Sequence, residues 1–252
     1  MNREELRRYI GVTGYSLGQV EKDYFQHIIL SALSRKSAGL LVFKGGTALQ
    51  KIGIIPRFSE DLDFTARADV SLEQIRDIAI SAIKNYNFPV ESDRFVNDGR
   101  TTSFRLKIQG PLYQNRLGIC TVRIEISTRE SVINEPIRKE FAPLYSDILP
   151  YVLDVMLTEE MLAEKIRAIY TRNKARDLYD IYKMLERKTT LERELTNKKL
   201  AYYRLSFDTS VFIKRCERLQ PHWNNELQSL IETVVPYQKA LDAVKKAVKD
   251  IN

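Results

Sequence analysis

Cysteine and histidine are scarce in this chain of 252 residues, which holds two of each. Cys120 and Cys216 are far apart and lack the spacing of metal ligands, which argues against a disulfide framework and a structural zinc site. His27 and His222 are also far apart, which argues against a zinc enzyme and a serine–histidine triad. We expect both histidines to be structural.

Long apolar runs are also missing. No stretch approaches the ~20 apolar residues that a membrane helix needs. The opening MNREELRRYI is charged, unlike the apolar stretch of a secretion signal. These absences predict a cytoplasmic protein with no membrane partner. Its length and its 44% of hydrophobic residues are enough for one large domain or two modest ones.

Positive charge is in excess and unevenly spread. The formal net charge is +7, and residues 165–218 alone carry fifteen Lys and Arg against seven Asp and Glu. Clustered positive charge favours partners that carry phosphate, because each neutralised phosphate releases a counterion. A solvated helical surface has the same pattern, so charge alone leaves both interpretations open.

Apolar periodicity divides the chain into two parts. Helical spacing predicts helices over 21–37 and 71–85. Short apolar or alternating runs predict strands over 40–43, 62–64, 103–109 and 120–128. After Pro150 the pattern predicts helices almost to the end, with a break near Asn173. We therefore expect a mixed α/β (α+β) domain, residues 1–150, and an all-helical domain, residues 151–252.

The stretch KGGTALQKIGIIPRFSEDLDF, residues 44–64, combines a glycine turn with two closely spaced carboxylates. In a strand, side chains two residues apart leave on the same face, so Asp61 and Asp63 point together, away from their apolar neighbours. Two such carboxylates repel each other unless a cation lies between them. Mg²⁺ takes oxygen ligands of this kind and keeps room for substrate phosphates. A turn with two solvated aspartates is the structural alternative.

The glycine turn strengthens this interpretation. Gly45 and Gly46 follow a predicted strand and precede a predicted helix over 47–52, where free backbone N–H groups favour an anion. The spacing G-x-x-x-x-G-K-[ST] is absent, so this is not a Walker loop. A tight turn alone would explain the glycines, but beside an Asp-x-Asp they predict a phosphate and metal site.

Glu125 is the candidate third acid of a two-metal phosphoryl- or nucleotidyl-transfer site. In VRIEIS, Ile124 and Ile126 form the buried face of a strand, which leaves Glu125 on the other face. If this strand lies beside residues 62–64, Glu125 joins the two aspartates. Otherwise it is an ordinary exposed strand glutamate.

These blocks resemble the AbiEii-type nucleotidyltransferase toxins, the toxin halves of type IV toxin–antitoxin and phage abortive-infection systems. The family pattern is a Gly-Gly-Ser/Thr turn, a Ser-x-Asp-x-Asp segment, a distant Lys and an Arg-Asp-x-x-Asp helix. The matching residues are Gly45-Gly46-Thr47, Ser59-Glu60-Asp61-Leu62-Asp63, Lys165, and Arg176-Asp177-Leu178-Tyr179-Asp180. Arg57 matches an arginine that usually stands two residues before the serine.

The resemblance implies a minimal nucleotidyltransferase fold related to DNA polymerase β, with a mixed sheet flanked by helices and a helical C-terminal domain that closes the active-site cleft. It implies transfer from NTP to an acceptor such as tRNA, with Mg²⁺ or Mn²⁺, and it allows a separate antitoxin partner. The expected catalytic residues are Asp61, Asp63, Lys165 and Asp177, and the expected metal ligands are Asp61, Asp63 and Glu125. The expected nucleotide-binding residues are Lys44, Gly45, Gly46, Thr47, Arg57, Ser59 and Arg176.

The second motif also has a physical interpretation. Lys165, Arg172, Arg176 and Asp180 are spaced seven, four and four, so one continuous helix would carry them on one side. Lys165 is then expected to reach NTP phosphates as a solvated, unpaired charge. Arg176 is expected to hold a phosphate bidentately or to orient Asp177. Ion pairs on an exposed helix are the alternative.

Two other classes of function remain open. A non-catalytic module that binds nucleic acid or a partner would keep the basic segment without needing three acids together. A small-molecule nucleotidyltransferase of the antibiotic-modifying kind would share the fold. The basic helical part speaks against the latter, because a neutral or cationic drug gains nothing from positive charge.

Overall fold

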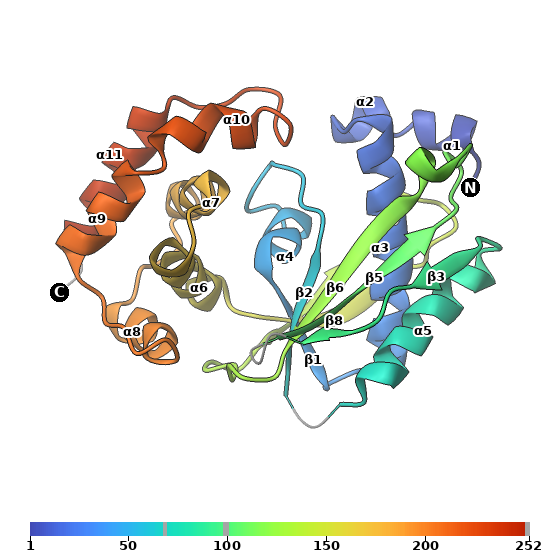
Figure 1. Cartoon of the computed structure of the whole chain (residues 1–252), viewed down its shortest axis with the longest axis horizontal. Coiled ribbons are helices and arrows are strands. Elements are labelled where there is room, and N and C mark those ends of the chain that lie inside the picture. The colour runs from blue at the N-terminus through green and yellow to red at the C-terminus, as the bar shows by residue number, and fades with distance from the viewer. Residues whose placement is uncertain (68–69, 98–100, 250–252) are drawn as a thin grey trace. The chain divides into compact units, whose positions relative to one another are not determined.

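The computed structural model describes residues 1–67, 70–97 and 101–249 (Figure 1). They form two compact units, each assembled from separate stretches of sequence. Unit 1 comprises Met1–Ala48, Glu60–Val132 and Pro136–Val155, and unit 2 comprises Leu49–Ser59, Ile133–Glu135 and Met156–Asn252. Residues 250–252, the end of the expected helical domain, lie outside the described residues. The predicted division into 1–150 and 151–252 stays a prediction.

Unit 1 is built on a mixed sheet, as the sequence predicted. Its strands are β1 (Leu41–Lys44), β2 (Leu62–Ala66), β3 (Val90–Ser92), β4 (Val96–Asn97), β5 (Thr101–Ile108), β6 (Cys120–Ser127), β7 (Ile137–Phe141) and β8 (Tyr151–Val155). The described strands follow the order β3-β5-β6-β2-β1-β8-β7, and β4 pairs with β5. β2 runs parallel to β6 and β1 parallel to β8, whereas the neighbours β1–β2, β5–β6 and β7–β8 are antiparallel.

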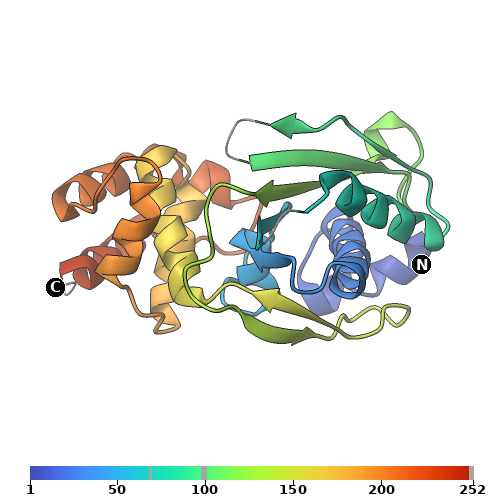
Figure 2. The same cartoon turned by 90° about the horizontal axis from the view of Figure 1, so that it is seen from below.

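Alternation along the strands decides which face of the sheet is buried. Phe104 and Leu106 of β5 and Ile124 and Ile126 of β6 are buried, whereas the residues between them on β6 are half-buried. The helices α3 (Leu17–Lys36) and α5 (Leu72–Asn85) lie side by side and pack on the sheet (Figure 2). Side chains of the alternate positions on β6 therefore point away from this core.

Side-chain caps define where α3 and α5 begin, and α3 begins at Leu17, ahead of the predicted start at residue 21. Ser16 caps α3 with a reciprocal bond to Gln19, and the hydroxyl of Ser71 accepts from the backbone N–H of Gln74 at the start of α5. Two short helices, α1 (Arg3–Arg7) and α2 (Ile10–Thr13), precede α3. A further helix, α4 (Gly45–Lys51), directly follows β1.

Two sequence predictions are corrected here. Residues 151–155, predicted as helical, form β8, because Tyr151, Leu153 and Val155 alternate inward and the strand pairs with both β1 and β7. The two glycines, predicted as a turn before a helix, belong to the first turn of α4 itself. The strands β3, β4 and β7 were not predicted, since they are short and mostly exposed.

Unit 2 is helical, as expected. Its helices are α6 (Thr158–Thr171), α7 (Ala175–Glu186), α8 (Arg193–Ala201), α9 (Thr209–Glu217), α10 (Trp223–Leu227) and α11 (Tyr237–Lys249), drawn from yellow to red in Figure 1. Trp223 is buried and its indole N–H donates to the carbonyl of Val235 at 2.8 Å. Tyr170 stacks on Phe212 with ring centroids 6.1 Å apart. Aromatic contacts thus join the helices of this unit.

A buried ion cluster also holds unit 2 together. Lys199 of α8 and Glu160 of α6 are fully buried, with 2.7 Å between Nζ and Oε1, and Glu164 is 3.1 Å from the same nitrogen. Glu160 also accepts the backbone N–H groups of Ile133 and Asn134, each at 2.9 Å. One buried carboxylate therefore fixes both a helix and the short segment 133–135.

Lys199→Met should destabilise the protein strongly. The substitution leaves Glu160 and Glu164 buried together without their shared cation, and breaking a buried pair in this way costs roughly 3–5 kcal/mol. The adjacent Lys198 is the matched control, because its pair with Glu194 is exposed. Lys198→Met should change the free energy of unfolding by no more than about 0.5 kcal/mol. Urea denaturation of both variants tests the cluster, and equal effects would contradict it.

Candidate active site

The start of α4 is shaped by one close approach. Gly45 has a φ of +77°, in the left-handed region that favours glycine. A Cβ atom at this position would lie 2.2 Å from Oδ2 of Asp63. Glycine is therefore required for two reasons, and the carboxylate of Asp63 fills the space that a side chain would occupy.

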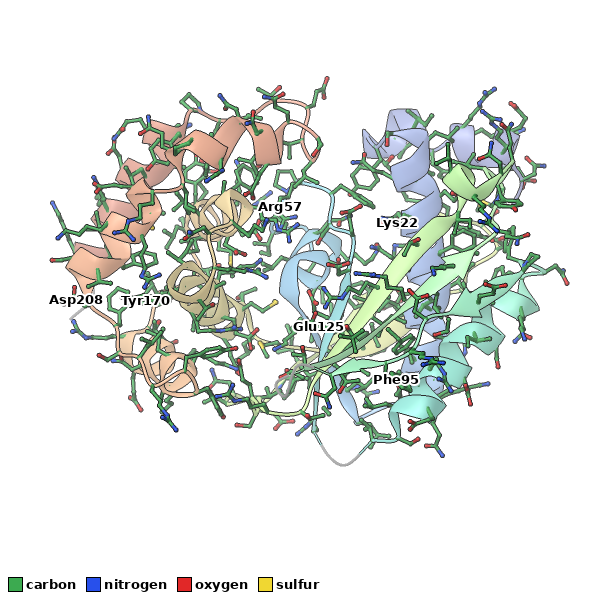
Figure 3. All side chains as sticks on the ribbon, viewed as in Figure 1. Lys22, Arg57, Phe95, Glu125, Tyr170 and Asp208 are labelled. Atoms are coloured by element: carbon green, nitrogen blue, oxygen red, sulfur yellow. The ribbon has the colours of Figure 1, made fainter. Side chains whose placement is uncertain are left out.

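Register places the second and third acids beside each other. β2 runs parallel to β6 with Asp63 opposite Glu125, so both side chains leave the same face of neighbouring strands (Figure 3 labels Glu125). The condition on which Glu125 was expected to join the aspartates, that the two strands are neighbours, is therefore met. Asp61 comes directly before β2, two residues ahead of Asp63. Its carboxylate makes no hydrogen bond or ion pair with any residue in the described ranges.

Two residues predicted to bind nucleotide lie next to these acids and are buried. Lys44 is the cross-strand partner of Asp63 on β1. The hydroxyl of Thr47 donates to the backbone carbonyl of Asp61, so this hydroxyl fixes the chain where it enters β2. This hydroxyl was expected to face a phosphate, but the side chain of Thr47 is fully buried.

The acids suit a hard divalent cation in donor type. Asp61, Asp63 and Glu125 offer only carboxylate oxygens, which Mg²⁺ prefers. Glu125 is also paired with Arg123, at 2.7 Å between Nη2 and Oε2. Among the residues that the structure describes, no three Asp, Glu, His or Cys side chains are grouped as a metal site. The two aspartates thus have the donor type that the ion prefers, whereas the carboxylate of Glu125 is engaged by Arg123.

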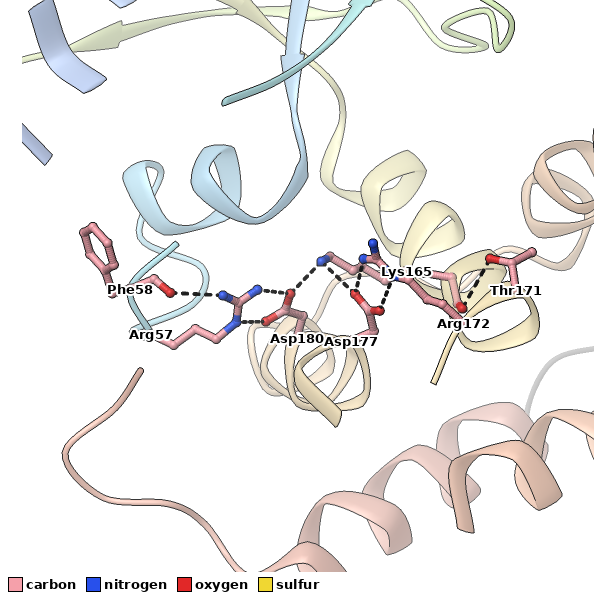
Figure 4. Close-up of polar contacts among 8 residues, drawn as sticks. Arg57, Phe58, Lys165, Thr171, Arg172, Asp177 and Asp180 are labelled. Atoms are coloured by element: carbon pink, nitrogen blue, oxygen red, sulfur yellow. Dashed lines mark hydrogen bonds and ion pairs between the residues drawn. The ribbon is translucent and has the colours of Figure 1, made fainter. Parts of the chain in front are cut away.

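Unit 2 contains a chain of alternating charges, drawn in Figure 4. Arg57 holds Asp180 bidentately at 2.6 and 2.7 Å and also donates to the carbonyl of Phe58. Lys165 lies between the two aspartates of α7, 2.7 Å from Asp180 and 3.1 Å from Asp177. A second guanidinium, that of Arg172, binds Asp177 at 2.8 and 2.9 Å. Both aspartates are fully buried.

These cations determine the protonation of the aspartates. Burial acts to raise the pKa of Asp177, but Lys165 and Arg172 outweigh it and hold the pKa below its usual range. Burial likewise opposes ionisation of Asp180, and Arg57 and Lys165 lower its pKa. Both carboxylates are therefore charged at neutral pH, and each needs its cations to stay so.

The geometry around Lys165 corrects the sequence prediction. The predicted break near Asn173 is confirmed, because α6 ends at Thr171 and α7 begins at Ala175, so Lys165 and Asp180 lie on two different helices. The intervening turn folds α7 back on α6 and brings Asp177 and Asp180 to Lys165. Lys165 is buried and paired with two carboxylates, so the prediction of a solvated, unpaired lysine is wrong. Asp180 was named in the motif but not expected in the site, and its spacing of three from Asp177 was the available signal.

The remaining predicted residues differ in their availability. The guanidinium of Arg57 is committed to Asp180 and Phe58, a different partner from the expected phosphate. The backbone N–H of Ser59 donates to Oε1 of Gln50 at 2.8 Å. Arg176 is half-buried, and its side chain makes no hydrogen bond or ion pair within the described part of the chain. Its role as a phosphate contact stays a prediction, as do the roles of the other two.

Comparison with known proteins identifies the family. The sequence profile of the nucleotidyl transferase AbiEii toxins of type IV toxin–antitoxin systems matches residues 28–249. The chain belongs to the AbiEii toxin family. It is therefore a nucleotidyltransferase toxin, as the motifs predicted.

Solved structures of similar fold support the AbiEii architecture. MenT4, a nucleotidyltransferase toxin from Mycobacterium tuberculosis H37Rv, has a TM-score of 0.70 and 21% identity, over 100% of this chain and 91% of that chain. JHP933 from Helicobacter pylori has a TM-score of 0.63 and 17% identity, over 93% and 92%. At these identities the likeness concerns the fold alone. No curated protein matches the sequence. Among the described helices of this AbiEii protein, none is long and apolar enough to cross a membrane.

Gly45→Ala should be more damaging than Gly53→Ala. Both glycines have positive φ, +77° and +79°, but a Cβ at Gly53 meets nothing within 4 Å. The shared backbone strain costs roughly 1–2 kcal/mol. The clash with Asp63 adds roughly 1–3 kcal/mol at Gly45 only. Thermal and urea unfolding of the two variants measure the difference, and equal losses would mean that Asp63 does not need the space over Gly45.

Lys165→Met should lower stability. It leaves Asp177 and Asp180 buried with one arginine each and no cation between them, at a cost of roughly 2–4 kcal/mol. Lys174→Met is the control, because Lys174 is exposed and unpaired among the described residues. It should stay within about 0.5 kcal/mol of the parent. The free energies of unfolding of the two variants and the parent test this prediction. A value for Lys165→Met equal to that of the parent would contradict a stabilising role of the ion chain.

Proposed function

We propose that this AbiEii toxin transfers a nucleotide from NTP to an RNA acceptor such as tRNA, with Mg²⁺ or Mn²⁺ held by Asp61 and Asp63 and joined by Glu125. One observation carries the proposal: Asp63 and Glu125 lie opposite each other on neighbouring parallel strands, Asp61 comes directly before β2, and Asp63 lies against Gly45 in the glycine turn at the start of α4. Such a turn suits phosphate, and such acids suit a divalent cation.

The proposed reaction is a displacement at the α-phosphorus. A hydroxyl oxygen of the acceptor forms a bond to this phosphorus, and the bond to the bridging oxygen of the β-phosphate breaks. Pyrophosphate leaves, and the hydroxyl proton passes to solvent. The metal, when bound, supplies positive charge to the phosphate oxygens. The residues of this chain contribute position, because Gly45 and Thr47 set where Asp63 and Asp61 stand.

Unit 2 contributes the remaining predicted residues. Arg176 is the proposed nucleotide contact there, because its half-buried guanidinium makes no hydrogen bond or ion pair among the described residues. Lys165 and Asp177 are proposed to act in transfer on the strength of the family motif, and their mutual ion pair holds the two side chains together. Arg57 and Asp180 are proposed as positioning residues that hold Lys165.

The biological context is proposed from the family. As a member of a type IV toxin–antitoxin family, the chain is proposed to act within the cytoplasm in phage defence, with a separate antitoxin chain that limits its activity. The rival function, a binding module without chemistry, differs in one respect. It predicts neither NTP binding nor Mg²⁺ binding, which calorimetry measures directly.

Incubation of the purified protein with each labelled NTP, Mg²⁺ and total RNA should yield labelled RNA of tRNA size. Asp61→Asn should lower transfer by roughly 10²-fold or more, because a group placed to stabilise developing charge is lost. Asp77→Asn is the matched control, since Asp77 is exposed on α5. It should retain full activity. Circular dichroism checks the fold of both variants, and a folded Asp61→Asn with full activity would overturn the metal assignment.

Label in a small molecule rather than RNA would favour the antibiotic-modifying alternative. Absence of transfer together with absence of NTP binding would favour the binding module. The two results are distinguishable, since the first requires turnover and the second excludes it.

A further inference from the structure

Two arginines stand directly opposite each other on the open face of the sheet in unit 1. Arg105 of β5 is the register partner of Arg123 of β6. Both occupy the positions that alternate with the buried residues of their strands, so both side chains leave the face opposite the core. Directly opposed like charges on neighbouring strands destabilise a sheet. The pair therefore calls for a compensating anion.

The protein supplies only part of that compensation. Arg123 donates to Oγ of Ser103 at 3.2 Å and pairs with Glu125. Arg105 is exposed, and its side chain has no hydrogen bond or ion pair with any residue that the structure describes. The nearby Asp93 is already bound by Lys107 at 2.6 Å. Arg123 is thus held in place by its partners, while Arg105 has its full set of donors available.

The order of the strands indicates which anion the pair receives. The sheet runs β5-β6-β2-β1, so the arginines lie on one side of Asp63 and the glycine turn after β1 lies on the other. In this order of strands, Asp63 on β2 lies between the two arginines and the glycine turn. Transfer requires that the α-phosphate of NTP lies at the acids. The triphosphate then lies on one side of the acids, and the acceptor RNA that supplies the attacking hydroxyl lies on the other.

We propose that Arg105 and Arg123 form a phosphate-binding pair for the backbone of the acceptor RNA. The proposal rests on the proposed function for the identity of the acceptor. Guanidinium groups bind phosphate bidentately, and two of them on adjacent strands match successive phosphates or both free oxygens of one. The pair positions the acceptor strand, carries no base preference and takes no part in the bond changes.

The test measures binding without turnover. The probe is a 5′-fluorescein-labelled RNA hairpin with a single-stranded 3′ end, titrated by anisotropy over a salt series. Arg105→Ala should weaken binding roughly tenfold, the loss of one charge-assisted contact. It should lower the slope of log K against log salt by about 0.7 to 1. Arg105→Lys keeps the charge and should recover part of the affinity.

A matched control separates a local contact from general charge. Arg138 is an exposed arginine of β7, at the opposite end of the sheet order, with its side chain 78% exposed. Arg138→Ala removes the same charge and should leave RNA affinity within about twofold, as expected of a distant surface position. Removal of Arg105 relieves like-charge repulsion, so its thermal midpoint should stay level or rise. A folded variant is therefore expected. Arg105→Gln provides a second test should the alanine variant fail to fold.

The competing source of phosphate is NTP itself. Calorimetry with a non-hydrolysable NTP analogue and Mg²⁺ should give the same affinity for Arg105→Ala as for the parent. A loss of NTP affinity with RNA binding intact would overturn the proposal and assign the pair to the triphosphate. Unchanged affinity for both would also overturn it, as would equal effects of the Arg105 and Arg138 substitutions.

These outcomes are separable from those of the proposed function. If the parent transfers label to RNA but its RNA affinity does not depend on Arg105, the arginine pair is contradicted and the proposed activity is supported. RNA binding that depends on Arg105, without transfer of label, would support the arginine pair and contradict the proposed activity. Failure of the parent to bind RNA overturns the pair and the RNA acceptor together.

Discussion

The contact between the Asp63 carboxylate and the backbone of Gly45 is the constraint on which the candidate active site depends. Without a side chain at Gly45, α4 can begin immediately after β1 while a charged group from β2 lies against it. The same contact fixes the spacing between the predicted phosphate turn and the acids. Strand register then places Lys44 and Glu125 on either side of Asp63.

Unit 2 is constrained by a different feature, the burial of several charged side chains together. Its ion chain contains the carboxylates of Asp177 and Asp180 and three cations, and each carboxylate receives two cationic partners. Desolvation of such groups is expensive, and the chain is tolerable only because the geometry is nearly complete. A network of this kind keeps one arrangement of α6 and α7, since partial versions leave an uncompensated charge.

Local patterns in the sequence predicted much of unit 1. The alternation in residues 120–128 and the helical spacing in residues 71–85 predicted the correct elements. Of the two aspartates at i, i+2 spacing, Asp61 comes directly before β2 and Asp63 lies opposite Glu125 of β6. What local patterns could not give was long-range pairing. The strand 151–155 has too few residues to compete with the helical signal around it, and its pairing with β1 spans more than a hundred residues. The burial of Lys165 depends on a turn that places Asp180 beside it, which helical spacing alone does not predict.

The bond between Arg57 and Asp180 joins positions 123 residues apart in the chain. During translation Arg57 is therefore synthesised long before Asp180. Unit 2 cannot reach its final arrangement until most of the polypeptide has been made. Loop closure over such a separation slows folding. A fragment that starts at Met156 would contain all of the described helices of unit 2 except the end of α4, yet it would lack the only bidentate counter-ion of Asp180 among the described residues. The helical half is thus not a module that can be separated from the rest of the chain, because Arg57, which balances the charge of Asp180, lies in the first quarter of the sequence.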